Sequence, residues 1–190
     1  GQVTGLYFRS VINNDNQKHF YLKDSTGLYP SYPKAETEKL IICESIIDTA
    51  TLLQIEAISK EYSLLASYGT NRLTAEHIEA IKELKNLKEI VFAFDNDEAG
   101  NKAVEKYSKE LKQLLPNLIF STLELPCKDV NETAQAHQSE IFLHLLENRS
   151  FLFSSETKLV EKEKPQTDSL PLMAGQAQLN TKNPFKIAYK

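Results

Sequence analysis

The chain has 190 residues, of which 41% are hydrophobic and 25% are charged, a composition typical of a globular protein with one sizeable core. Its formal net charge of −4 argues against an extensive surface that coats nucleic acid. No apolar run approaches the roughly 18 residues of a membrane helix, and the two cysteines are isolated, so we expect a cytoplasmic protein without membrane contact.

Residues 1–38 are expected to form a β-rich lead-in segment. Two alternating apolar runs, 3–11 and 20–22, flank the turn-forming sequence Asn13-Asn14-Asp15-Asn16. Alternation on both sides of such a turn is typical of a β-hairpin. Because the sequence begins with Gly, we also expect it to be a piece of a longer protein.

Basic residues outnumber acidic ones near the amino terminus, where Arg9, Lys18, Lys23 and Lys34 face only Asp15 and Asp24. Arg9, Lys18 and Lys23 belong to the predicted hairpin, where aromatic residues lie between the two lysines. This pattern predicts a template groove in which cations contact phosphates and an aromatic ring stacks on a base. A half-buried strand with a solvated face fits the same pattern. Arg72 is a candidate for triphosphate binding, although a loop arginine is more often simply exposed.

Residues 39–150 alternate between strand and helix patterns. Short apolar runs, typical of strands buried on both faces, alternate with segments of helical spacing. The expected strands are 39–43, 63–66, 89–94 and 118–125. The expected helices lie at about 46–57, 74–84, 98–115 and 139–147, with a loop over 126–132. This order predicts an α/β domain with a Rossmann-like, mostly parallel four-stranded sheet flanked by helices.

The composition becomes polar toward the carboxyl terminus. Helical periodicity fades from about residue 154, and the sequence Glu161-Lys162-Glu163-Lys164-Pro165 has no apolar residue to bury. We therefore expect residues 151–190 to be a linker or mobile tail.

Acidic residues follow three of the expected strands. Glu44 follows the first strand, Asp95 and Asp97 follow the third, and Asp129 follows the fourth. Right-handed crossovers bring the carboxyl ends of parallel strands to one edge, so these side chains should lie close together. Clustered carboxylates repel one another unless a cation balances them. Together they predict a divalent-metal site for phosphate chemistry, although each acid alone fits a solvated loop or a helix N-terminus.

Two stretches with these acids resemble the toprim domain shared by topoisomerases and primases. They are Ile42-Cys43-Glu44-Ser45-Ile46-Ile47-Asp48 and Phe94-Asp95-Asn96-Asp97-Glu98-Ala99-Gly100. The resemblance is to bacterial-type primases in particular, especially the primase-like proteins of plasmids and transposable elements. Residues 19–23, 66–74 and 128–132 support it, and it covers roughly residues 1–150.

The resemblance implies that Glu44, Asp95, Asp97 and Asp129 bind Mg²⁺ or Mn²⁺ and support nucleotidyl transfer. Asp95 and Asp97 would hold the metal, and Glu44 would take part in the proton or metal chemistry. The implied function is RNA primer synthesis on single-stranded DNA from ribonucleoside triphosphates, in a mobile-element or plasmid replication protein. A helicase or another replication protein is the further partner that the resemblance implies.

The sequence also departs from the pattern of classical primases. Asn131 stands where they carry another acid, and the cysteine set of an upstream zinc-binding module does not occur here. The chain thus resembles a central fragment, and whether it primes unaided is left open. A toprim nuclease and a non-catalytic module that binds nucleic acid or a partner are the alternative functions.

Overall fold

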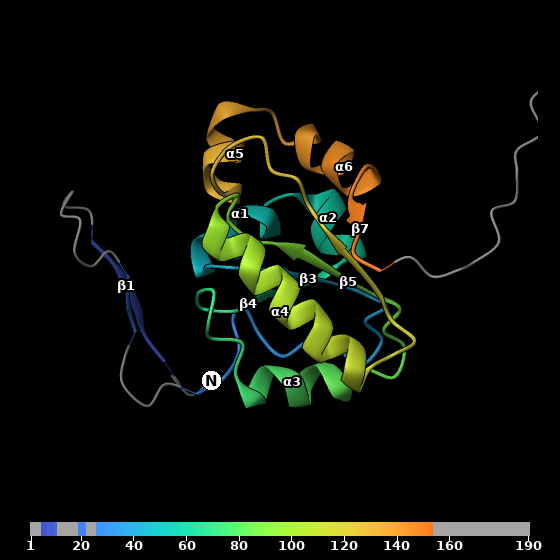
Figure 1. Ribbon diagram of the computed structural model, residues 1–190. Coiled ribbons are helices and arrows are strands. Elements are labelled where there is room, and N and C mark those ends of the chain that lie inside the picture. Colours follow the sequence, from blue (N-terminus) through green and yellow to red (C-terminus); the bar gives the residue numbers. More distant parts are fainter. Residues whose placement is uncertain (1–4, 11–18, 22–25, 154–190) are drawn as a thin grey trace, which may run out of the picture. The chain divides into compact units, whose positions relative to one another are not determined.

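The computed structural model describes residues 5–10, 19–21 and 26–153 (Figure 1). Within these residues, five strands form one sheet in the order β4-β3-β5-β6-β7. The strands are β3 (Lys39–Cys43), β4 (Ser63–Ala66), β5 (Glu89–Ala93), β6 (Ile119–Thr122) and β7 (Ser150–Phe151). The first four are parallel to one another, and β7 is antiparallel to β6. The predicted α/β class with a mostly parallel sheet is therefore confirmed.

Helices connect the strands and cover both faces of the sheet (Figure 1). They are α1 (Ile46–Leu53), α2 (Glu56–Glu61), α3 (Ala75–Lys82), α4 (Glu98–Leu114), α5 (Val130–Ala136) and α6 (Glu140–Glu147). In the described part of the chain, every helix is too short or too polar to span a bilayer.

The expected hairpin is present where the structure describes it. Strand β1 (Tyr7–Arg9) pairs antiparallel with β2 (His19–Tyr21), with Phe8 opposite Phe20. The predicted turn at 13–16 lies outside the described residues.

Three elements correct the sequence-based prediction. The helix predicted at about 46–57 ends at Leu53, and a separate helix, α2, follows it at Glu56–Glu61. The sheet has a fifth strand, β7, because a two-residue strand is too short to show alternation, and it crosses the predicted boundary at residue 151. Helix α5 begins inside the predicted loop, because the Asp129 side chain accepts a hydrogen bond from the Glu132 N–H at 2.7 Å and caps the helix. The rest of the predicted tail lies outside the described residues.

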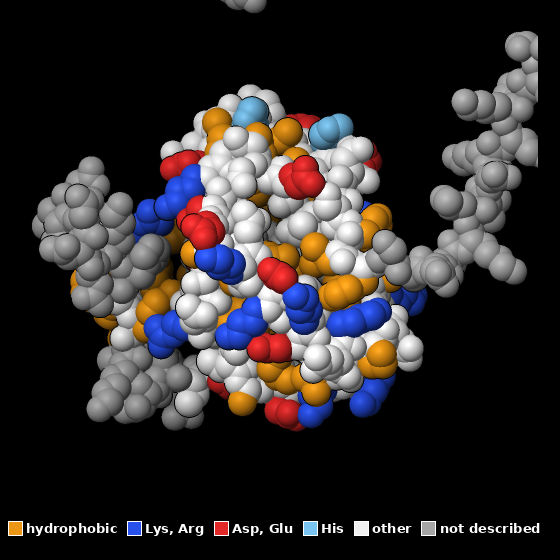
Figure 2. All heavy atoms as spheres, viewed as in Figure 1, with side chains coloured by type: hydrophobic (Ala, Val, Ile, Leu, Met, Phe, Trp, Pro, Cys, Tyr) orange, Lys and Arg blue, Asp and Glu red, His pale blue; other side chains and the backbone are white. Residues whose placement is uncertain are grey.

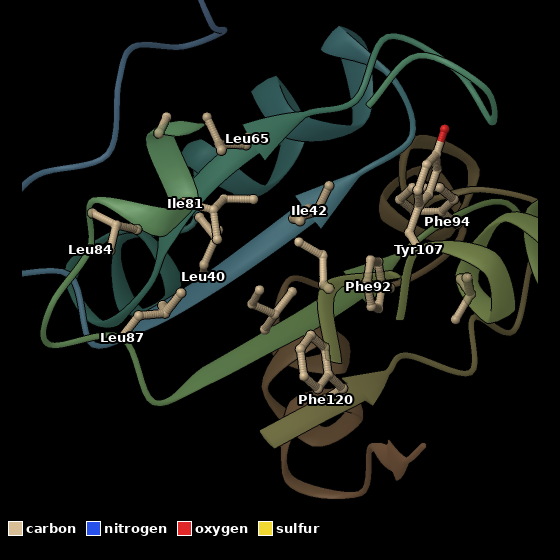
Figure 3. Packing of buried hydrophobic residues seen from close by; sticks show 14 of the residues in the cluster. Leu40, Ile42, Leu65, Ile81, Leu84, Leu87, Phe92, Phe94, Tyr107 and Phe120 are labelled. Atoms are coloured by element: carbon tan, nitrogen blue, oxygen red, sulfur yellow. The ribbon is translucent and has the colours of Figure 1, made fainter. Parts of the chain in front are cut away.

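The core consists of two apolar clusters, one on each face of the sheet. Alternate residues of a strand point to opposite faces, so Leu40 and Ile42 belong to the cluster beneath α3 and α4 (Figure 3). Ile41 and Cys43 belong to the cluster beneath α1, α2, α5 and α6. Because β3 is fully buried from Leu40 onward, both layers of helices hold the carboxyl ends of the strands in fixed positions.

The exposed face of α4 carries charges of both signs. Figure 2 shows Lys and Arg side chains interspersed with Asp and Glu over this helix. Lys102 pairs with Glu98 and Lys109 pairs with Glu105, each at 2.5 Å and four residues apart. This face is therefore a solvated one with balanced charge, as expected for an exposed helix.

An ion pair links the residue before β7 to the centre of the sheet: its acid, Glu89, is buried, and its base, Arg149, is 19% exposed. The Arg149 guanidinium donates two hydrogen bonds to the Glu89 carboxylate, at 2.6 and 2.9 Å, and Ser121 Oγ donates a third at 2.9 Å. The Glu89 side chain is only 5% exposed. Removing one partner would leave an uncompensated buried charge, whereas removing both would not.

We therefore predict that Arg149→Met lowers the free energy of unfolding by about 3–5 kcal/mol, measured by urea denaturation. The double variant Glu89→Leu with Arg149→Met should recover most of this loss. A double variant no more stable than the single one would contradict the assignment.

His77 is buried inside the domain and is fully hydrogen-bonded. Its Nε2 donates to the Ala66 carbonyl at 2.9 Å, while Nδ1 accepts from the Thr74 N–H at 3.2 Å. Burial lowers the pKa of this imidazole below its ordinary value. The neutral ring is therefore part of the fold.

This burial predicts that the contribution of His77 to the free energy of unfolding falls as the pH falls from 7 to 5. Below its ordinary pKa of about 6.5 the histidine of the unfolded chain takes up a proton that the folded one resists, so the unfolded state gains. Glu44 and Asp95 have raised pKa values and act in the opposite direction. The measurement is therefore the difference between the unaltered chain and His77→Gln in free energy of unfolding at each pH. A difference that does not shrink toward pH 5 would contradict the prediction.

Candidate metal and nucleotide site

The predicted acids lie at the point where the connections of the sheet change direction. The chain leaves β3 toward β4 on one side and returns to β5 on the other, so the carboxyl ends of β3 and β5 form a topological switch point. Open α/β sheets bind ligands in the crevice at such points. Glu44 follows β3, and the Asp95 N–H donates to its Oε2 at 3.4 Å. The structure therefore brings Glu44 and Asp95 together.

Asp97 and Asp129 occupy equivalent places at the starts of two helices. Asp97 Oδ1 accepts from the Gly100 N–H at 2.8 Å and caps α4, as Asp129 caps α5. The two loops are joined, because the Asn96 N–H donates to the Lys128 carbonyl at 2.6 Å. In each carboxylate, the second oxygen takes no part in the cap bond. All four predicted acids thus belong to adjoining loops at one edge of the sheet.

The acids raise one another's affinity for protons. Burial, followed by the charges of Glu44, Asp48 and Asp129, raises the pKa of Asp95 to about 7. Burial is also the largest cause of the raised pKa of Glu44. Lys128 opposes both shifts, but its Nζ lies 4.0 Å from Asp95 Oδ2 and remains largely exposed. Among the described residues, Lys128 therefore balances only part of the negative charge of Glu44 and Asp95.

Asp48 is a fifth acid of this edge that we did not identify as a site candidate from the sequence. It is 4% exposed, and its Oδ1 accepts the Asn131 N–H of α5 at 3.1 Å. Burial raises its pKa, and the charge of Asp129 adds to the rise. The sequence did contain a signal for Asp48. It lies four residues, about one helical turn, after Glu44, so both carboxylates belong to the same end of α1.

The donor chemistry of the edge fits a hard divalent cation. Carboxylate oxygens are the ligands that Mg²⁺ and Mn²⁺ prefer, and Mg²⁺ typically takes one or two of them beside water and phosphate oxygens. Among the described residues, however, no three His, Cys, Asp or Glu side chains are arranged as a formed metal site. The acids are neighbours whose remaining oxygens are not gathered around one point.

The predicted basic residues fall into two groups. Arg9 lies within electrostatic reach of Asp48, whose pKa it lowers, and the Arg72 guanidinium lies 4.8 Å from the centroid of the Tyr21 ring. Lys18 and Lys23 lie outside the described residues. Two arginines of the prediction therefore lie near the acidic edge.

Tyr21 is packed inside the domain. Its ring centroid lies 5.2 Å from that of Tyr7 and 5.7 Å from that of Tyr68. Burial is the largest cause that raises its pKa to about 12. Within the hairpin, this ring is used for internal packing, so the predicted stacking of a base is better suited to Phe20, which is 42% exposed.

Gly100 allows the start of α4 to approach the acidic loop. A Cβ built on this residue would lie 2.1 Å from the Asp95 carbonyl oxygen, which is far inside any allowed contact. The Asp97 cap bond to the Gly100 N–H depends on the same approach. A side chain at this position must displace either the helix or the backbone of Asp95.

We predict that Gly100→Ala lowers the free energy of unfolding by about 1–3 kcal/mol, the usual cost of overpacking, and shifts the Asp95 amide resonance. The matched control is Ala99→Gly in the same helical turn, which should cost about 1 kcal/mol through backbone entropy and leave that resonance in place. Equal displacement of Asp95 in both variants would refute the steric explanation.

Comparison with known proteins gives the same classification for the central part of the chain. Residues 41–134 match the family described as Toprim-like. The chain is 30% identical over 113 residues to the DNA helicase/primase of Enterobacteria phage T3, a match covering 57% of this chain and 18% of that protein. The chain therefore spans less than a fifth of the length of that relative.

Two solved structures have a similar fold. The E. coli primase catalytic core is 24% identical, with a TM-score of 0.60, over 80% of this chain and 50% of that one. A chain in the structure of bacteriophage T7 lagging-strand DNA polymerase with two primase domains is 24% identical, with a TM-score of 0.52. That match covers 67% of this chain and 65% of the other.

Proposed function

Because residues 41–134 form a toprim domain related to those of primases, we propose that the chain supports metal-dependent RNA primer synthesis on single-stranded DNA. The observation that carries the proposal is the meeting of Glu44 with Asp95 at the switch point, with two capping aspartates in the adjoining loops. We further propose that the chain is part of a plasmid or mobile-element replication protein that works with a helicase or another replication protein.

Asp95 and Asp97 are the proposed ligands of Mg²⁺ or Mn²⁺, and Asp129 completes the acidic rim. When bound, such an ion would neutralise phosphate charge and polarise the reacting oxygens. The side chain of Glu44 is half-buried and burial raises its pKa, which makes its carboxylate a stronger base, and Glu44 is the proposed acceptor of the proton of a primer hydroxyl.

The arginines are the proposed contacts for phosphate. Arg9 and Arg72 lie near the acidic edge, where their fixed charges would attract a triphosphate. Lys18 and Lys23 are proposed to contact the phosphates of the template strand, which would position it without reading its sequence.

We predict that Asp95→Asn combined with Asp97→Asn abolishes Mn²⁺ binding by the chain in a calorimetric titration and abolishes metal-dependent primer synthesis by the intact protein. Asparagine still caps a helix, so α4 should remain folded. Glu110→Gln, an exposed acid farther along α4, is the matched control and should change neither property. Full activity in the double variant would refute the assignment.

A non-catalytic binding module is the second candidate. It is favoured by the lack of an assembled metal site among the described residues and by the net charge of −4. Such a module predicts no Mn²⁺ affinity at millimolar concentration. The nuclease alternative is tested by incubating the protein with labelled nucleic acid and a divalent metal. Loss of the labelled nucleic acid without added triphosphates would indicate a nuclease.

A further inference from the structure

Tyr68, in the loop that follows β4, has a backbone conformation that a large side chain rarely adopts. Its φ is 63°, and among the described residues it is the only residue other than glycine with a positive φ. Steric clashes disfavour this region for a bulky residue, so the conformation persists only where surrounding contacts hold it. The loop adjoins the acidic edge, because the Gly69 N–H donates to the Glu44 carbonyl at 2.8 Å.

The side chain of Tyr68 contacts two other segments that hold this conformation. Its hydroxyl donates to the Gly27 carbonyl at 3.1 Å, and its ring meets the His77 ring edge-on, with centroids 5.3 Å apart. His77 is itself buried and bonded to the Ala66 carbonyl at 2.9 Å. The half-buried ring of Tyr68 is therefore a fixed apolar surface against which another ring can pack.

The hairpin meets this loop through Tyr21 of β2. The centroid of the Tyr21 ring lies 5.7 Å from that of Tyr68, and the Arg72 guanidinium, from the same loop, lies 4.8 Å from it. On the other face of the hairpin, Phe8 and Phe20 are 57% and 42% exposed. Because a two-stranded hairpin is at best marginally stable alone in water, its position depends on contacts such as the one between Tyr21 and Tyr68.

The hairpin and the loop each bring an arginine to the acidic edge. Arg9 of β1 lies within electrostatic reach of Asp48. Arg72 is exposed, and its guanidinium lies over the Tyr21 ring. A guanidinium stacked on a ring keeps its N–H groups for an anion. Displacement of the hairpin would therefore move Arg9 and remove the support of Arg72 at the same time.

We propose that Tyr68 is a positioning residue whose ring holds the hairpin against the loop and so places Arg9 and Arg72 beside the acidic edge. The inference rests on the proposed function, in which these arginines attract phosphate, and adds the residue that fixes their place. The backbone next to Tyr68 bonds Glu44 while its ring packs on Tyr21. One strained residue thereby keeps the acids and the arginines in register.

The first measurement is amide hydrogen exchange of the full chain, followed by NMR without any ligand. Tyr68→Gly removes the ring but keeps a residue that adopts a positive φ freely, so the loop backbone should stay in place. Exchange in β1 and β2 should become about 10-fold faster, as expected for the loss of one aromatic pair, and exchange in β5 should not change. Tyr68→Phe keeps the ring and should exchange as slowly as the unaltered chain. Asn71→Gly, at an exposed position of the same loop, is the matched control and should have no effect.

The second measurement is the affinity of the same variants for Mn²⁺ and, with Mn²⁺ saturating, for inorganic tripolyphosphate. Tyr68→Gly should raise the Kd for tripolyphosphate about 3- to 10-fold, as expected for one lost hydrogen bond. It should leave the Kd for Mn²⁺ unchanged, because the arginines move and the acids do not. A role of Tyr68 confined to stability would leave both dissociation constants of the folded protein unchanged.

The outcomes separate this inference from the proposed function. Unchanged hairpin exchange in Tyr68→Gly would overturn the positioning role, and so would unchanged tripolyphosphate affinity in a variant whose hairpin exchanges faster. An equal loss of Mn²⁺ and tripolyphosphate binding would also overturn it, because Tyr68 would then act on the acids. If the unaltered chain binds neither probe, the proposed function fails, whereas hydrogen exchange still decides whether Tyr68 holds the hairpin.

Discussion

The candidate site depends on the parallel pairing of β3 with β5. In this register Cys43 lies opposite Ala93, so both strands end at the same level and their following residues share one edge. A slip by one residue would turn every side chain of the strand to the other face of the sheet. Ile42 would then face the helices that cover Ile41, and Ile41 would face the helices that cover Ile42. The two apolar clusters oppose such a slip, because each is formed by alternate residues of the same strands. Core packing thus sets the distance between Glu44 and the Asp95 backbone.

The same carboxylates perform a structural task that shapes their chemistry. Asp97 and Asp129 each use one oxygen to cap a helix, which fixes the side chain and leaves its second oxygen outside the cap bond. A cation could be bound there without breaking either cap. This explains how acids that form no closed group in the described structure can still suit a metal that arrives with phosphate oxygens and water as its other ligands.

Part of this arrangement could be predicted from the sequence because it depends on local patterns. Apolar runs identified β3 and β5, and the parallel topology placed Glu44 and Asp95 at one edge. The Glu89–Arg149 pair could not be predicted, because it joins residues 60 apart in the sequence. Strand β7 could not be predicted because its two residues leave no periodic signal. Asp48 could not be identified as a member of the site, since its burial against α5 depends on how two helices that are distant in the sequence pack.

Positive charge reaches the acidic edge from both sides of the central strands. On the β3 side, Arg9 lies near Asp48 and Arg72 lies over Tyr21, whose pKa also reflects the charge of Glu44. On the β6 side, Lys128 lies in the loop that precedes α5, and its Nζ is 4.0 Å from Asp95 Oδ2. The acids at this edge are therefore flanked by positive side chains from two different parts of the chain. The hairpin, through Arg9 and Tyr21, then contributes to the polarity of the site and not only to the fold.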